Sequence, residues 1–330
     1  MATYEYYETV GELISNKIIP KSEVYDFEMS PRSEIYRKYF QFCQENLSER
    51  CQEYGIQPAK FFFRENFEVN ARAGFVNKYF IIAVNKGTID TLYEFFYNQN
   101  NVFEETTLSE FRELNTILDV PVEYVMYQSA ILFTYYHELG HLIQMSPDLS
   151  FWINEQYDND QNNFNPLKHI YEFDADMHAA NTVCFHPIDL WRKLSDENRS
   201  QRNLERLLSL TLSGIFSYFI FLMKNRNEGI YYAKHTHPHP LIRITYILTA
   251  FVGVAREYYV DISQKNIVND ALEISTLLFR RLDVEDVVVE YRNTLLTEYS
   301  HIIEYLAVVV ESAKSVPNLA INTVHKKSKG

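Results

Sequence analysis

The sequence predicts an α+β protein that is mostly helical, with a small antiparallel sheet beside one buried helix. Glycine and proline are few, nine and ten among 330 residues, while 46% of the residues are hydrophobic. That composition describes a compact globule without linkers or low-complexity tracts. Most segments show apolar residues at helical spacing, and two neighbouring runs, 61–69 and 79–85, are rich in strand-forming residues.

The first third of the chain contains helix signals and the two strands. Residues 1–29 are predicted to form a short helix and a loop. Ser30 and Pro31 are typical of an N-cap and a first-turn proline, and Gly55 is typical of a helix end. The two strand-forming runs are predicted to pair in antiparallel fashion through the connection 70–78.

Several further helices follow. Residues 88–97 look helical, and Thr107 with Glu110 forms a capping box for a helix that reaches Leu118. Pro121 opens a long apolar helix that is predicted to end at Met145.

Residues 135–143 read Tyr-Tyr-His-Glu-Leu-Gly-His-Leu-Ile and have the spacing of a metal site. His137 and His141 lie on one face of such a helix, where both imidazoles can bind one Zn²⁺. Glu138 lies close enough to accept a proton from a water on that metal. The alternative is a buried helix with two hydrogen-bonded core histidines.

A second stretch, residues 172–176, reads Glu-Phe-Asp-Ala-Asp and offers the third ligand that an open zinc site requires. Glu172 can be that ligand. Asp176, one turn later, can accept the outer N–H of a ligating histidine, most simply His137. Asp174 is expected to point to another face and to serve as a control for Asp176.

Small residues in the same predicted helix, Ala175, Ala179 and Ala180, would let it approach the zinc helix closely near Gly140. A third segment, Thr236-His237-Pro238 followed by Arg243-Ile244, adds a hydrogen-bonding and a cationic group far along the chain from the proposed ligands.

The three motifs together, His-Glu-x-x-His, Glu-x-x-Ala-Asp and Thr-His-Pro-x-x-x-x-Arg-Ile, resemble those of gluzincin metallopeptidases such as the Ste24/HtpX group. The closer resemblance is to the Lit phage-exclusion peptidases, and it covers about half of the chain, residues 79–248. Members of that family are known for cleaving a host translation elongation factor during phage infection. No residue of this sequence specifies that substrate.

This resemblance implies a zincin-like catalytic domain over residues 58–330, preceded by a helical scaffold segment, 1–57, in one compact unit. It implies one zinc per chain and a strand beside the zinc helix that can pair with an extended substrate backbone. The alternative is a strand that only closes the core. His237, chosen by the motif over His235 and His239, would donate a hydrogen bond to the oxyanion. The alternative is that all three histidines lie in an ordinary surface loop. Arg243 would hold its segment through a carboxylate or bind substrate, with the structural role favoured.

Two stretches have ambiguous roles. The segment 146–166 is rich in Asn and Asp and is predicted to be a loop, either solvated or substrate-binding. The uncharged run 207–223 is near the lower length limit for a membrane span and is predicted to be a buried core helix instead. Two helices, 267–282 and 284–313, are predicted to follow, ended by Pro317.

Composition limits the partners. A net charge of −13 argues against nucleic-acid binding, because phosphate contacts need a basic face, and the basic cluster 325–329 reads as a solvated end. Cys43, Cys51 and Cys184 have no metal or disulfide spacing. No apolar leader follows Met1, so a cytoplasmic location is expected, with no membrane association.

The sequence therefore predicts metal-assisted hydrolysis of a peptide bond in a protein or peptide substrate, with Glu138 as the base. A housekeeping gluzincin-type peptidase is one alternative. Another is a non-catalytic regulatory or binding protein, in which a fourth ligand such as His169 or His178 closes a structural zinc site. The sequence does not indicate an oligomeric state.

Overall fold

A computed structural model describes residues 2–98, 100–105, 108–145, 151–154, 164–223, 229–259, 261–282, 286–316 and 318–320. Within them the protein is α+β and mostly helical, as predicted. The helices are α1 (Ala2–Ser15), α2 (Ser33–Tyr54), α3 (Lys86–Tyr97), α4 (Ser109–Leu114), α5 (Val122–Gln144), α6 (Pro166–Val183), α7 (Phe185–Arg192), α8 (Gln201–Met223), α9 (Pro240–Tyr258), α10 (Gln264–Arg280) and α11 (Asp286–Ala313). The strands are β1 (Ala59–Arg64), β2 (Ala71–Val76), β3 (Tyr79–Asn85) and β4 (Phe151–Asn154).

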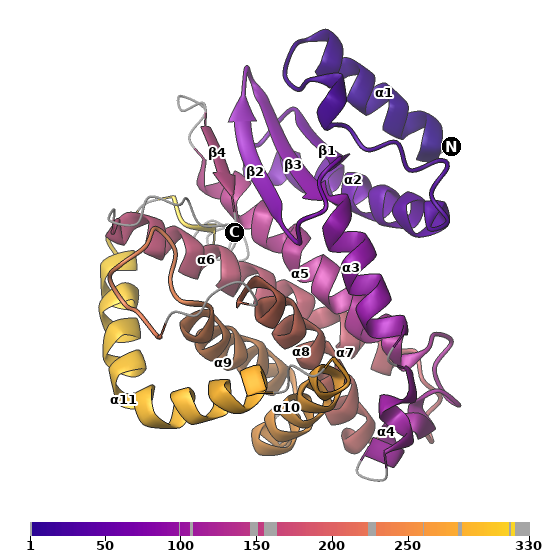
Figure 1. The fold of residues 1–330 in the computed structure, drawn as a ribbon, viewed down its shortest axis with the longest axis vertical. Coiled ribbons are helices and arrows are strands. Elements are labelled where there is room, and N and C mark those ends of the chain that lie inside the picture. The colour runs from indigo at the N-terminus through magenta and orange to yellow at the C-terminus, as the bar shows by residue number, and fades with distance from the viewer. Residues whose placement is uncertain are drawn as a thin grey trace.

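The sheet lies at one end of the molecule, with α1 and α2 on its outer side and α5 beneath it (Figure 1). Its strand order is β1-β3-β2-β4. β1 runs parallel to β3, whereas β2 is antiparallel to both β3 and β4. The predicted antiparallel pairing of 61–69 with 79–85 is therefore wrong, and the sheet is mixed.

The reason for this error is the strand β2, which the sequence conceals. Residues 71–76 read Ala-Arg-Ala-Gly-Phe-Val, and alanine and glycine are poor strand formers. A two-residue turn at Asn77 and Lys78, with φ values of 45° and 73°, folds β2 back onto β3. Positive φ at both positions is the geometry that tight hairpins favour. β1 consequently has to join β3 from the other side.

The loop predicted over 146–166 is also partly wrong. Residues 151–154 form β4, which pairs with β2, and α6 begins at Pro166. Residues 146–150 and 155–163 lie outside the described residues, as do Thr107, Pro317 and the basic cluster 325–329.

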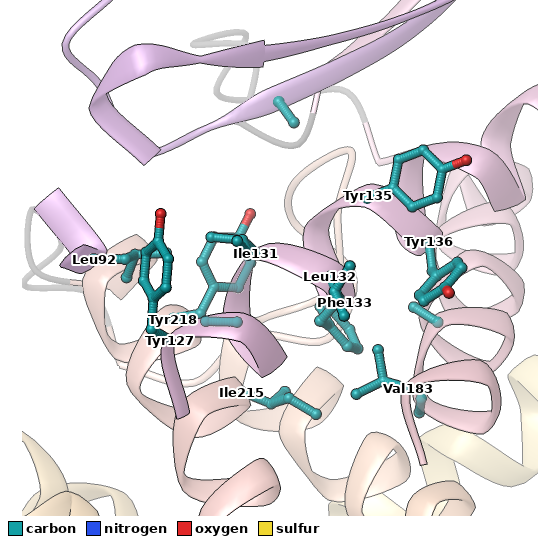
Figure 2. Packing of buried hydrophobic residues seen from close by; sticks show 14 of the residues in the cluster. Leu92, Tyr127, Ile131, Leu132, Phe133, Tyr135, Tyr136, Val183, Ile215 and Tyr218 are labelled. Carbon is teal, nitrogen blue, oxygen red and sulfur yellow. The ribbon is translucent and has the colours of Figure 1, made fainter. Parts of the chain in front are cut away.

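Helix α5 is the centre of the fold, and the predicted start after Pro121 is confirmed. Every residue from Ser129 to Gln144 is buried, including both histidines. Figure 2 shows the apolar side chains of α5, among them Ile131, Leu132 and Phe133, between the sheet and the side chains of α6 and α8. A helix that is apolar on all sides has to be enclosed in this way.

Helix α6 packs closely against α5, as the small residues predict. A Cβ atom built on Gly140 would lie 2.9 Å from Cα and 3.2 Å from Cβ of Ala175. The backbones therefore approach as closely as they do because position 140 has no side chain. This contact brings Glu172 of α6 next to the histidines of α5.

The apolar run 207–223 lies in α8, the one described helix long and apolar enough to cross a membrane, and 78% of its apolar window is buried inside the protein. It contacts α5, α7 and α10, the position predicted for a core helix. Other helix boundaries shift by a few residues. Ser30 is not the cap of α2, which begins at Ser33, and α4 ends at Leu114 rather than Leu118.

Candidate metal centre

Three side chains that the sequence singles out meet inside the protein. His137 and His141 come from α5 and Glu172 from α6, and one ligand atom from each lies within 4.8 Å of the others. Nε2 of His141 is 3.2 Å from Oε1 of Glu172, and Nε2 of His137 is 3.6 Å from Oε2. The ligands of a tetrahedral zinc ion are about 3.4 Å apart, so these separations fit one ion.

The outer nitrogen of His137 is held by a carboxylate. Nδ1 of His137 lies 2.8 Å from Oδ1 of Asp176, which is the contact predicted for that aspartate. Arg243 of α9 donates from Nε to Oδ2 and from Nη2 to Oδ1 of Asp176, both over 2.8 Å. The hydroxyl of Tyr246 also donates to Oδ2. Because an ionised carboxylate only accepts, Nδ1 carries the proton and Nε2 is the nitrogen left for a metal.

The outer nitrogen of His141 is held by a neutral amide. Nδ1 of His141 lies 2.9 Å from Oε1 of Gln144. Nε2 of Gln144 donates to the backbone oxygen of Tyr171 over 2.9 Å and to Oδ2 of Asp174 over 2.6 Å. The expectation that Asp174 is an uninvolved control is therefore wrong, because Gln144 reaches from the end of α5 and links it to His141.

The charges of the site favour different protonation of the two histidines. Burial and the neighbouring His141 lower the pKa of His137 to about 4, against the attraction of Asp176 and Glu172. Burial also disfavours a proton on His141, but the Glu172 carboxylate outweighs it and raises the pKa of His141.

The carboxylates are held ionised. Burial favours a protonated Glu172, but His237 and His141 outweigh it and lower its pKa well below the ordinary range. For Asp176 the Arg243 guanidinium outweighs burial and lowers the pKa. Both groups are therefore negative at neutral pH.

This balance of buried charge suits a cation. Glu138, Glu172, Asp174 and Asp176 are carboxylates with 0–2% exposure. The buried guanidinium of Arg243 lies 2.8 Å from Asp176 and 3.5 Å from Glu172. Among the described residues, Nε2 of His141 and Oε2 of Glu172 make no hydrogen bond. Each does lie at ion-pair distance from a charged group, 3.2 Å from Oε1 of Glu172 and 3.5 Å from Nη2 of Arg243. Buried charged and polar atoms normally have partners, so the residues present fit a divalent metal ion.

Glu138, the predicted base, is fully buried next to His137. Helix α5 packs against β2, which carries Arg72. Burial and Arg64 lower the pKa of Arg72, against the attraction of the Glu23 and Glu138 carboxylates. The Glu138 carboxylate therefore lies within electrostatic range of the sheet.

His237 is the histidine of its segment that faces the ligands, as the motif register predicts. Its Nε2 lies 3.3 Å from Oε1 of Glu172, and its Nδ1 lies 2.9 Å from the hydroxyl of Thr236. The ring of His239 instead accepts a backbone N–H at the start of α9, and the ring of His235 packs against a tyrosine.

The two candidates for a fourth ligand lie outside the ligand group that the described residues form. Nδ1 of His169 contacts the hydroxyl of Tyr305, and its Nε2 lies 2.8 Å from the backbone oxygen of His235. His178 is buried in α6, where burial and the charge of Arg50 lower its pKa to about 4. Within the described part of the chain, neither histidine belongs to the ligand group.

Comparison of the chain with protein-family models, with curated proteins and with solved structures finds no match. The site is therefore interpreted from its own geometry. Sequence reasoning misses Gln144, Tyr246 and the role of Asp174, although the sequence contains a signal for Gln144 and Tyr246. Gln144 follows His141 by three residues, and Tyr246 follows Arg243 by three, so each pair shares a helix face.

Proposed function

We propose that this protein is a zinc-dependent endopeptidase with a zincin-like catalytic fold. The observation that carries the proposal is the convergence of His137, His141 and Glu172, with both outer nitrogens held so that both Nε2 atoms face one carboxylate. Two neutral imidazoles and one carboxylate leave a bound zinc ion net positive, so that it can polarise a carbonyl group and lower the pKa of water.

Glu138 is the general base in this proposal. Its carboxylate accepts a proton from the attacking water while the water oxygen bonds to the carbonyl carbon of the substrate. When the carbon–nitrogen bond breaks, Glu138 gives that proton to the leaving amine. Its complete burial beside His137 supports this role, because a fixed base next to the ligands needs no rearrangement.

His237 stabilises the oxyanion in this proposal. The Thr236 hydroxyl, 2.9 Å from Nδ1, can donate to that nitrogen, which leaves Nε2 as the protonated, donating atom. Nε2 lies beside the ligand group, 3.3 Å from Glu172, so a substrate oxygen there would be within its reach.

An enzyme is favoured over a closed structural site because the ligand group contains three members and no fourth among the described residues. Structural zinc is almost always held by four protein ligands. The motif resemblance extends the proposal to a cytoplasmic phage-defence protease that acts on a host protein such as a translation elongation factor. A housekeeping peptidase with the same site is the alternative.

The test uses Glu138→Gln, which keeps the shape of the side chain but cannot accept the proton. The variant is expected to bind one zinc per chain and to fold normally, yet to lose proteolysis by at least about a hundredfold. Glu123→Gln, at the start of α5, is the matched control and should retain activity.

The measurement is a proteome-wide search for new N-termini after expression of the wild type and of each variant. A search of this kind identifies the substrate at the same time, including an elongation factor if that is cleaved. Equal cleavage by Glu138→Gln and the wild type would remove Glu138 from the mechanism.

A further inference from the structure

The support of His141 extends beyond the helices of the site. Helix α11 runs along the edge of the molecule and contacts α6 (Figure 1). After it, the backbone N–H of Ala320 donates to Oδ2 of Asp174 over 2.6 Å. A residue 146 positions from Asp174 in the sequence therefore contacts the carboxylate that holds Gln144.

Apolar packing docks this C-terminal segment, which we define as Val316 with residues 318–320. The side chains of Val316 and Leu319 form a cluster with α6 and the end of α11 that is separate from the main core, whereas Ala320 packs in the main core. The members of this cluster are Ile170, Val309, Ala313, Val316 and Leu319. Leu319 and Ala320 are 2% and 0% exposed, so the segment is buried rather than resting on the surface.

The hydrogen bonds give the Gln144 amide a single orientation. The Tyr171 carbonyl and the Asp174 carboxylate can only accept, so the NH₂ group has to face them. The amide oxygen must then face Nδ1 of His141, which makes Nδ1 the protonated nitrogen and leaves Nε2 for the metal. Asp174 thus selects the histidine tautomer that can bind metal, although it does not touch the histidine.

Asp174 in turn depends on donors to keep its place. It is 1% exposed, and a buried carboxylate needs hydrogen bonds to remain charged in one position. The Ala320 N–H and the Gln144 amide donate to the same oxygen, Oδ2. If the segment leaves, Oδ2 loses a donor and gains access to water, so it holds the amide less firmly.

We propose that the C-terminal segment is a positioning element of the metal centre, and that its docking, through Asp174 and Gln144, raises the affinity of His141 for metal. Because binding equilibria are reciprocal, metal binding also tightens the docking of the segment by the same factor. This positioning role rests on one part of the proposed function, the binding of a metal by the three ligands. It does not depend on proteolysis.

The test compares two substitutions at one position in the full chain. Ala320→Pro removes the N–H that donates to Asp174, whereas Ala320→Gly keeps it. Zinc is titrated into each metal-free protein in competition with a chelator, and circular dichroism checks folding. Ala320→Pro is expected to bind zinc about tenfold more weakly than the wild type, which is the low end of the effect for residues that hold metal ligands. Ala320→Gly is expected to bind zinc within about twofold of the wild type.

A second measurement is independent of substitutions in the segment. Hydrogen exchange at Leu319 and Ala320 is followed in the wild type and in Glu172→Gln, with and without zinc. Zinc should slow exchange about tenfold in the wild type and have no effect in the variant that lacks the ligand.

The outcomes separate the two proposals. If the wild type binds no zinc, the metal site itself is wrong. If it binds zinc but Ala320→Pro binds it as tightly and zinc does not slow exchange, only the positioning role is wrong. Should Ala320→Pro fail to fold, Asp174→Ala replaces it, and wild-type zinc affinity in that variant overturns the role.

Discussion

His137 and His141 lie one turn apart on the same helix, yet the groups behind them differ in kind. Behind His137 is a charged and fully internal support, in which Asp176 is held by two bonds from Arg243. Behind His141 is a neutral amide, whose partners extend to the C-terminal segment. The residues behind His137 all come from α6 and α9. The contacts behind His141 include Ala320, which is far from Asp174 in the sequence. Two equivalent ligands can therefore differ in how easily they are disturbed.

Removal of a metal ligand should weaken zinc binding more than removal of the residue that holds that ligand in place. His141→Ala is expected to lose stoichiometric zinc, since two protein ligands remain. His178→Ala, also buried but outside the ligand group, is the control and should keep one zinc per chain. Elemental analysis of the purified proteins decides this, and full zinc in His141→Ala would contradict the ligand assignment.

The charged support is expected to matter more than the neutral one. Asp176→Asn keeps an oxygen for Nδ1 of His137 but removes the charge that Arg243 pairs with, so zinc affinity should fall about ten- to a hundredfold. Gln144→Leu should cost about tenfold, because a neutral hydrogen bond is weaker. The exposed Asp189→Asn serves as the control. Metal titration measures the zinc affinity of each variant. A larger loss of affinity in Gln144→Leu than in Asp176→Asn would contradict this order.

The helix contact at Gly140 should affect both supports alike. In Gly140→Ala the new Cβ would meet Ala175 at 2.9 Å, so α6 has to move away from α5 with Glu172 on it. Overpacking of this kind costs about 1–3 kcal/mol of stability, and we expect zinc affinity to fall about tenfold or less. Gly253→Ala, where nothing lies within 4 Å, is the matched control. Chemical denaturation and zinc titration that show no change in Gly140→Ala would refute the close contact.

Acidification should act on the two histidines unequally. In the metal-free protein burial lowers the pKa of His137 to about 4, so it stays neutral above that pH, whereas the Glu172 carboxylate outweighs burial and raises the pKa of His141. Below the pKa of His141 zinc has to displace a proton from that ring, so affinity should fall by up to tenfold per pH unit there and level off above it. Chelator competition across pH 5 to 8 measures the slope. A slope of two protons at neutral pH would show that both rings titrate together.

The role of Asp176 behind His137 could be predicted from the sequence, whereas the role of Gln144 behind His141 could not. Asp176 follows Glu172 by four residues, so local helix geometry alone places both carboxylates on one face. The link from Gln144 to Asp174 joins two helices at a depth and rotation that only their packing decides. The sheet illustrates the same limit, since β2 is concealed by alanine and glycine and its pairing follows from a turn at Asn77 and Lys78. Local patterns predict ligands, whereas contacts between elements depend on the assembled fold.

The position of Arg243 has a kinetic consequence. Arg243, near the start of α9, donates two hydrogen bonds to Asp176, the carboxylate that orients His137. Arg243 follows His237 by only six residues. The same ion pair therefore also anchors the segment that places His237 beside Glu172. Substitutions at Asp176 and His237 should therefore not act independently. In a double-mutant cycle the combined loss of kcat/KM should be smaller than the product of the separate losses, because release of the anchor already displaces His237. One internal ion pair would thus make metal binding and the oxyanion stabilisation that we propose for His237 vary together.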